Sequence, residues 1–286
     1  MNQETELLVT AIQSLKQQPN FIKDYIFPVV SAFSTSILGA GVAYLLLNKR
    51  EVLQQEKEKM NAANKWTLDV EQARSNLIAI KSNYCGKLNA DPLKRINAVP
   101  TILFKVDSIV EKYTDLAFIV PNAIDETKKL SKWHQITLIK TMISNYNYLN
   151  LLWEQRNQLN DVYKQKLLQN NGNKAYSDLK HQQILNIIGD ADLVILIEFT
   201  ERCIKLTDQL IIELDSFLKE FPVFVKTKIK TKKLESYGFI IQYPNNDNKA
   251  LLKILKEEPE VDFSNVVHMY GESIDELKKR HLTGYE

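Results

Sequence analysis

The longest uninterrupted apolar stretch in the sequence runs for 22 residues, from Ile26 to Leu47, without a charged residue. At 1.5 Å per residue, a helix of this length crosses the hydrocarbon core of a bilayer. Tyr25 and Tyr44 stand near its two ends, where aromatic rings favour the membrane interface. We therefore predict a transmembrane helix over residues 26–47. A buried helix of a soluble protein is the alternative.

The residues on either side of this helix predict its orientation. Five basic residues follow it within about twenty positions, whereas Lys16 and Lys23 precede it, and the positive-inside rule places the more basic flank in the cytoplasm. The stretch leads straight into residues 48–50 without a small-residue cleavage site, so we expect a retained signal anchor. The chain is thus expected in a bacterial inner membrane as a single-pass protein, with its N-terminus outside and its C-terminal region in the cytoplasm.

Residues 1–25 form a short tail before the membrane helix. Its apolar residues from Leu7 to Leu15 recur at helical spacing and end before Pro19. This pattern predicts a short amphipathic helix, which could lie on the outer membrane interface or pack against its copies.

Small side chains form one face of the predicted transmembrane helix. They occur in two adjacent rows with a spacing of four residues: Ser31, Thr35, Gly39 and Ala43, and Ala32, Ser36 and Ala40. In lipid, where no hydrophobic force drives helix association, small side chains let two backbones approach closely. This face therefore predicts self-association into a homo-oligomer or contact with another membrane helix. An idle face is the alternative.

Residues 51–59 are rich in charges and glutamine and contain no helix breaker, so we expect the membrane helix to continue as a stalk. An apolar heptad pattern then follows, with the members Ala63, Trp66, Val70, Ala73, Leu77, Ile80 and Tyr84. Alternating spacings of three and four place all of them on one side of a helix. This heptad seam fits either a short coiled coil between chains or the inward face of an intramolecular bundle.

Apolar residues at helical spacing predict a mainly α-helical fold for residues 48–221, the stalk and bundle region. We expect one helix from about Asp125 to Gln169 and another from Ser177 to about Glu220, with a turn at residues 170–173 between them. Short loops favour an antiparallel bundle of four or more helices.

After Pro222 the apolar period changes from 3.6 to 2, which predicts a small α+β appendage over residues 222–286. Residues 223–232 would form the first strand of a β-hairpin, and residues 237–243 would form the return strand. Two short helices would follow, from Asp247 to Glu257 and from about Ser273 to Arg280.

Four lysines alternate with the β-branched residues of the first predicted strand: Lys226, Lys228, Lys230 and Lys232. We expect this lysine row to face solvent, because a shift by one residue would bury four ammonium groups. The row could protect a sheet edge from pairing, or it could contact an anionic surface, either lipid headgroups or a nucleic acid.

Composition and motifs give no sign of catalysis. The 37 basic residues nearly balance the 35 acidic ones, and a net charge of +2 does not favour a nucleic-acid partner. Cys85 and Cys203 cannot build a disulfide framework or a structural zinc site, and the four histidines, interpreted as surface residues, stand in no metal-binding spacing. Glycine-rich phosphate-binding motifs are absent. We therefore predict a non-enzymatic protein without catalytic residues, metal or cofactor.

Arg156 and Asn157 match the first two positions of the Arg–polar–His pattern of HEPN-class helical ribonucleases. The next histidine is His181, so the catalytic base of that pattern is missing and the sequence does not support membership. We interpret Arg156 as a residue on the bundle surface.

Together these features predict a membrane-anchored helical assembly protein that acts through self-association, a cytosolic protein partner, or both. One specialised form is an effector whose assembly perturbs the membrane on a cytosolic signal, as in anti-phage abortive systems. The alternatives are a membrane-tethered nucleic-acid-binding module that uses the lysine row, and an enzyme whose catalytic groups are scattered along the sequence. The lipid bilayer is the partner that the sequence predicts most directly.

Overall fold

The computed structural model describes residues 3–16, 22–103, 108–110, 112–121, 131–170, 181–243 and 249–285. Within these residues the regular elements are helices and no strand occurs, which confirms the mainly α-helical prediction. The chain forms two compact units, Met1–Glu56 and Lys57–Glu286.

The first unit contains α1 (Gln3–Lys16), the π-helical turn η1 (Ile22–Ile26) and the beginning of α2 (Phe27–Ser82). Every side chain from Ile22 to Leu47 is exposed. Among the described residues, this is the one helix that is long and apolar enough to cross a membrane, judged by its length and composition.

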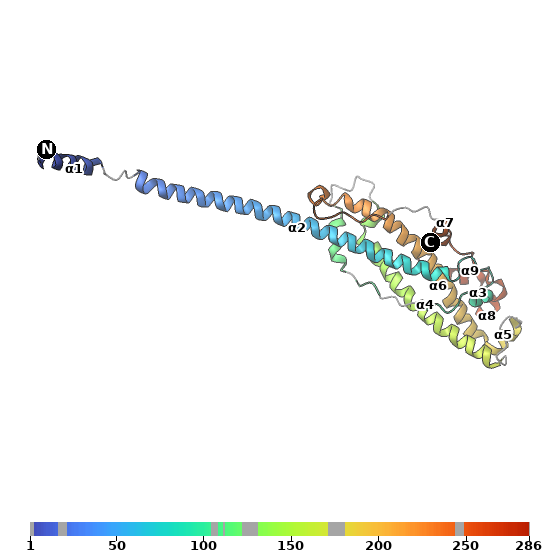
Figure 1. Cartoon of the computed structure of the whole chain (residues 1–286). Helices are drawn as coiled ribbons and strands as arrows, with labels where there is room; N and C mark the ends of the chain where they lie inside the picture. The colour runs from blue at the N-terminus through green and yellow to red at the C-terminus, as the bar shows by residue number, and fades with distance from the viewer. Residues whose placement is uncertain are drawn as a thin grey trace. The chain divides into compact units, whose positions relative to one another are not determined.

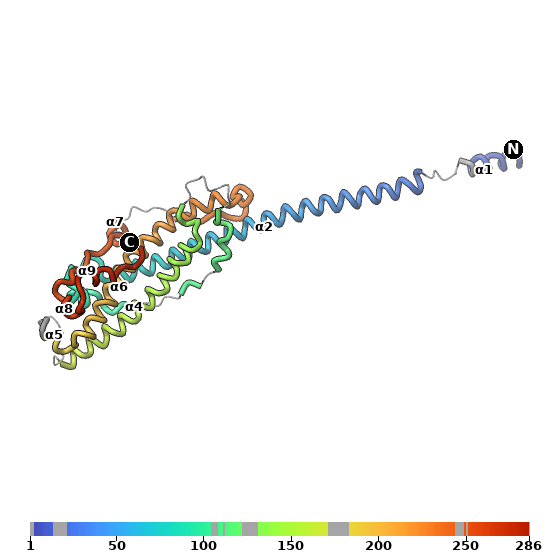
Figure 2. Tube along the Cα trace, turned by 180° about the vertical axis from the view of Figure 1, so that it is seen from behind, coloured from blue at the N-terminus to red at the C-terminus, as the bar shows by residue number. Residues whose placement is uncertain are grey.

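Three long helices build the second unit: α2 from Lys57 onward, α4 (Ile136–Asn170) and α6 (Asp190–Lys226). They lie side by side in both views (Figure 1, Figure 2). The Trp153 indole N–H of α4 donates to the Thr207 hydroxyl of α6 at 3.0 Å. Further along α4, the Arg156 Nε–H donates to the Thr200 hydroxyl of α6 at 3.3 Å. Because one residue number rises while the other falls, α4 and α6 run antiparallel.

The heptad seam of α2 forms an inward face of this bundle. All its members are 2% exposed or less, from Ala63 at one end to Tyr84 at the other. The Tyr84 ring lies 5.8 Å from the Trp153 ring of α4, and the Trp66 ring lies 5.3 Å from Tyr113, measured between ring centroids. Residues of the same chain therefore cover the seam, as in the intramolecular alternative.

The connection from α2 to α4 contains α3 (Pro92–Ala98), η2 (Tyr113–Ile119) and η4 (Lys132–His134). Asp91 caps α3, because its carboxylate accepts the Leu93 N–H at 3.0 Å. The predicted start of the next helix at Asp125 lies outside the described residues, and α4 itself begins at Ile136.

The helix predicted from Ser177 to Glu220 is divided in two. Ser177 lies outside the described residues, and α5 (His181–Ile188) ends before Gly189. Gly189 has φ of +86°, a value that residues with a Cβ rarely adopt, and α6 begins directly after it. A single glycine thus separates two helices that share one apolar pattern.

The described residues after Lys226 form the short helices η6 (Thr231–Lys233), α7 (Lys249–Ile254), η7 (Phe263–Asn265), α8 (Val267–Tyr270) and α9 (Ile274–Arg280). The helix predicted from Ser273 to Arg280 is confirmed as α9, and Ser273 and Glu276 form a capping box at its start. Phe263 and Leu277 belong to an apolar cluster that also includes Leu93, Leu167 and Leu196.

The predicted β-hairpin is wrong. Residues 223–226 continue α6 beyond Pro222, and residues 237–243 form no strand or other regular element. The alternation fails at Phe224, an apolar residue on the face that was assigned to the lysines. Phe221, Phe224 and Val225 are buried at helical spacing, and their burial outweighs the hydrogen bond that Pro222 cannot donate.

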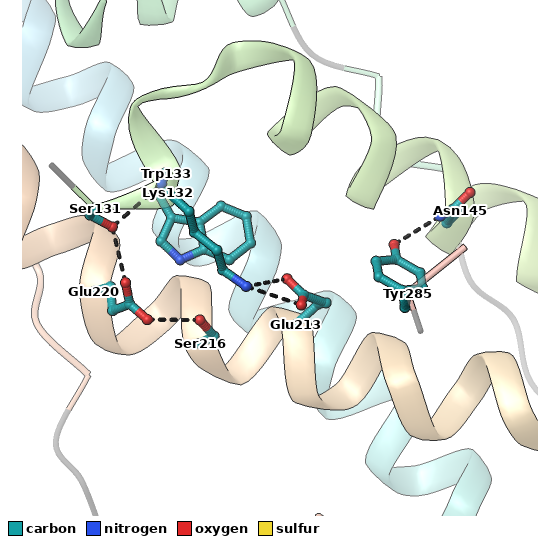
Figure 3. A network of polar contacts seen from close by, with 8 residues as sticks. All are labelled: Ser131, Lys132, Trp133, Asn145, Glu213, Ser216, Glu220 and Tyr285. Carbon is teal, nitrogen blue, oxygen red and sulfur yellow. Dashed lines mark hydrogen bonds and ion pairs between the residues drawn. The ribbon is translucent and has the colours of Figure 1, made fainter. Parts of the chain in front are cut away.

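The short helix η4, which precedes α4, is held on α6 by polar contacts (Figure 3). The Lys132 ammonium donates to both Glu213 carboxylate oxygens at 3.0 and 2.8 Å, and the Ser131 hydroxyl donates to Glu220 at 3.0 Å. At the opposite side of the same view, the Asn145 amide donates to the Tyr285 hydroxyl at 2.8 Å. The C-terminal residues are therefore part of the bundle and contact α4 directly.

Candidate functional site

Three buried ion pairs cross the middle of the second unit. The acids Glu201, Asp208 and Asp215 are seven residues apart on α6, so they lie on one face of that helix. Their partners are Arg95 of α3 and two residues of α2 that are also seven apart, Arg74 and Lys81. We name these six residues the buried ion-pair ladder.

The ladder pairs are close and almost fully shielded from water. The Lys81 ammonium lies 2.7 Å from the Asp208 carboxylate, and the Arg95 Nε lies 3.2 Å from Glu201 Oε1. The six side chains are between 1% and 10% exposed. Charges at such depth are tolerated only when each has an opposite partner and further hydrogen bonds.

The acceptors of the further hydrogen bonds lie in the C-terminal part of the chain, the residues from Tyr243 onward. Arg74 donates to the Tyr243 hydroxyl, Lys81 donates to the backbone carbonyl of Lys256, and Arg95 donates to the carbonyl of Pro259 at 2.9 Å. Each base of the ladder thus has one acid on α6 and one oxygen acceptor beyond residue 242. This arrangement fastens the C-terminal part across α2, α3 and α6.

Two ladder acids have raised pKa values. Burial raises the pKa of Glu201 to about 7, although the Arg95 guanidinium opposes this shift. Burial also raises the pKa of Asp208, against the opposing charge of Lys81 and the Glu258 backbone N–H, which donates to it at 2.6 Å. Desolvation therefore exceeds the attraction of the partner at both carboxylates.

A cavity of about 350 Å³ lies between α6 and the C-terminal part, beside the two ladder pairs of Glu201 and Asp208. Phe263 and His281 also line it, and their rings are stacked with centroids 5.1 Å apart. Burial lowers the pKa of His281 to about 4, so the imidazole is neutral at physiological pH. The surface interpretation of the histidines is therefore wrong for His281, which is 7% exposed.

Two titratable residues at or near this cavity, Glu201 and Cys203, are buried. Glu201 has a pKa suited to proton transfer, but its Oε1 is shielded from solvent and faces Arg95. Burial raises the pKa of the nearby Cys203 thiol far above its ordinary value. Among the described residues, no group of three or more His, Cys, Asp or Glu side chains could hold a metal ion.

Arg156 is a buried structural residue, and its assignment to the bundle surface is wrong. It is 0% exposed and donates to the carbonyls of Ile96, Val99 and Pro100 at 3.0, 2.7 and 2.9 Å. Ile96 lies in the last turn of α3, Val99 is its C-cap and Pro100 follows, so no later turn of α3 supplies N–H donors to these carbonyls. Arg156 therefore caps α3 and holds it against α4.

The residues predicted to form surfaces are distributed over both units. The small-residue face lies on the exposed part of α2, where the Thr35 hydroxyl donates to its own helix at Ser31 O, 2.8 Å away. Lys226 ends α6, and the rest of the lysine row follows in the turn and in η6. Neither set contributes to the ion-pair ladder.

The ion-pair ladder was missed by the sequence analysis, although the sequence contains a signal for it. Acids at 201, 208 and 215 interrupt an apolar helix at a heptad spacing, and the bases at 74 and 81 repeat that spacing beside the heptad seam. The contribution of Arg95 and of the C-terminal carbonyls has no such signal, because only the fold brings those groups together.

Comparisons of the chain with protein-family models, with curated proteins and with solved structures found no match.

Proposed function

We propose that this chain is a membrane-anchored, non-enzymatic helical protein that acts through self-association of its membrane helix and through a cytosolic partner bound by its bundle. The observation that carries the proposal is the apolar segment of α2, residues 26–47, which is exposed along its whole length. Exposing so many apolar side chains to water costs free energy, and a bilayer removes that cost.

The proposed orientation, with the bundle in the cytoplasm, is supported by the basic residues that follow the apolar segment. Self-association is supported by the small-residue face. The hydroxyls of Ser31 and Thr35 are already bonded to carbonyls of their own helix, so they can lie in a helix interface without a further partner.

The nucleic-acid alternative is not proposed as a second function. It depended on a hairpin that presents four lysines from one strand, and that strand is absent from the described residues.

Membrane fractionation tests the anchor. We expect the full chain to stay in membranes after a carbonate wash, and protease added to spheroplasts to leave the C-terminal region intact. The double variant Leu38→Arg/Val42→Arg should lose retention, because each arginine costs about 3 kcal/mol at the bilayer centre. Leu68→Arg, on the exposed surface of the second unit, is the matched control and should be retained. Release of the wild type by carbonate contradicts the anchor, and external digestion of the C-terminal region contradicts the orientation.

A further inference from the structure

One end of the second unit combines a high density of lysines with exposed apolar side chains. Residues 223–243 contain five lysines and one acid, Glu235. Lys226, Lys230, Lys232 and Lys233 are exposed at the end of α6, in the turn that follows it and in η6. Val223 and Phe239 are also exposed, at 61% and 76%. We name residues 223–243 the basic apolar surface.

The exposed position of Phe239 is fixed by its surroundings. The Asn64 amide of α2 donates to the Phe239 carbonyl at 3.0 Å, and its oxygen accepts the Ile241 N–H at 2.8 Å. The neighbouring side chain Ile240 is 9% exposed and holds the other face of the segment in the core. The Phe239 ring is therefore held outward, where it gains nothing from the fold of this unit.

Lysines and apolar groups of this surface are neighbours in space. Lys226 and Phe239 line the same hollow of about 440 Å³, together with Thr231 and Glu235. The Lys57 ammonium of α2 lies 4.6 Å from the centroid of the Tyr237 ring, which is 46% exposed. Cations beside outward aromatic rings are the composition that binds at the interface of an anionic membrane.

We propose that the basic apolar surface docks on anionic phospholipid headgroups of the membrane that holds the apolar segment of α2, with Phe239 inserted at the interface. This proposal rests on the proposed membrane anchor. The tether supports the choice of partner: Lys57 follows Leu47 by ten residues, so it lies within about 36 Å of the end of the apolar segment in any arrangement of the chain. A membrane is therefore present at high local concentration for this surface.

The experiment uses the full chain in lipid nanodiscs, with Phe239→Cys carrying a polarity-sensitive fluorophore in a Cys85→Ser background. In discs that contain anionic lipid we expect a blue-shifted emission. Raising the salt from about 0.1 M to about 1 M should reverse the shift, because the screening length falls from about 10 Å to about 3 Å. Neutral discs should show no shift. Emission that is the same in neutral and anionic discs overturns the proposal.

Charge removal distinguishes docking from simple proximity to the disc. Replacing Lys226, Lys230, Lys232 and Lys233 with Gln should abolish the shift, whereas the same change at the exposed residues Lys94, Lys140, Lys278 and Lys279 should preserve it. A fluorophore at Leu151→Cys, an exposed position on α4, should not respond to lipid charge. A shift that survives the first set of substitutions overturns the electrostatic attachment.

Two further outcomes have separate meanings. Failure of the protein to co-elute with the discs overturns the membrane anchor itself, whereas co-elution without a lipid-dependent shift overturns docking alone. A shift that appears only on adding a single-stranded oligonucleotide assigns the surface to nucleic acid and rejects lipid as its partner.

Discussion

Individual buried charges in the ion-pair ladder depend on their partners, because each was removed from water when the chain folded. Removing one member of a buried pair leaves an uncompensated charge, whereas removing both members can be nearly neutral. The effects of substituting the two residues of one ion pair on the unfolding free energy should therefore be strongly coupled.

We predict that Lys81→Met lowers the unfolding free energy by about 3–5 kcal/mol, because the Asp208 carboxylate loses its partner at 2.7 Å. The double variant Lys81→Met/Asp208→Leu should be clearly more stable than this single variant. Urea unfolding of the full chain in detergent, followed by the fluorescence of three buried tryptophans, measures both. Lys166→Met removes the exposed pair with Asp192 and should change stability by less than about 1 kcal/mol. Equal losses in the single and double variants would contradict the coupling.

Two groups beside the cavity respond to acid in opposite directions. The pKa of Glu201 is raised from 4.5 to about 7, so its stability contribution is present below 4.5 and is lost as the pH rises through about 7. The pKa of His281 is lowered from 6.5 to about 4, so its contribution is present above 6.5 and is lost as the pH falls through about 4. Between pH 6.5 and 4.5 the two contributions to the unfolding free energy therefore change in opposite directions with pH.

Single variants should separate these slopes. On acidification from pH 6.5 to 4.5, Glu201→Gln should lose unfolding free energy relative to the wild type, by on the order of 1 kcal/mol per pH unit. His281→Phe, which keeps an aromatic ring against Phe263, should gain relative to the wild type over the same interval. Urea unfolding at several pH values provides the comparison. Parallel pH profiles for all three proteins would show that neither group titrates as its burial implies.

At the scale of elements, the seam of α2 illustrates how a heptad pattern is used inside one chain. Leu77 is 0% exposed within the bundle, and Leu68 on the same helix is 52% exposed. Both residues are leucines on the same helix, so the difference between them lies in their surroundings.

We predict that Leu77→Ala lowers the unfolding free energy by about 2–5 kcal/mol, the range for a leucine removed from a packed core. Leu68→Ala should change it by less than about 0.5 kcal/mol, as expected for a surface site. The loss at Leu77 should not depend on protein concentration, because the packing partners belong to the same chain. A loss that disappears on raising the concentration would instead place the seam between chains.

At the scale of the whole molecule, the proposed self-association is assigned to the apolar segment of α2 and not to the bundle. A Cβ added at Gly39 or at Gly41 meets no atom of the chain within 4 Å, so a larger residue at either site leaves the fold undisturbed. Two positions apart on a helix, the two glycines face nearly opposite directions. Gly39 belongs to the small-residue face and Gly41 does not.

We predict that Gly39→Ile weakens assembly without preventing insertion, because the branched side chain keeps two helix backbones apart. Gly41→Ile, the same change on the other face, should assemble like the wild type. Chemical crosslinking in membranes and the mass of the detergent-solubilised protein both report assembly. Unchanged assembly in Gly39→Ile would make the small-residue face idle.

Much of the helical architecture could be predicted from local patterns. The apolar segment of α2, the heptad seam and the capped helix α9 each depend on residues close in sequence, and the hydrophobic period identifies such elements reliably. The same method failed after Pro222, where short alternation suggested a strand. There the burial of Phe221, Phe224 and Val225 against the bundle decided for helix, and this packing is invisible to a local pattern.

The candidate site was the least predictable part. Arg156 and His281 were interpreted as surface residues because charged and polar side chains usually are. Both are buried, since Arg156 finds the free carbonyls at the end of α3 and His281 stacks on Phe263. Such partners lie far away in sequence.

The sequence by itself determined that the chain contains one apolar segment of membrane-spanning length and that the rest is mainly helical, because length, charge and hydrophobic period act over neighbouring residues. The tertiary structure alone decided that the seam of α2 is covered from within and that six charged residues pair in the core. The physical reason is that a buried charge or an apolar seam is stable only with specific partners, and the fold supplies those partners from distant parts of the chain.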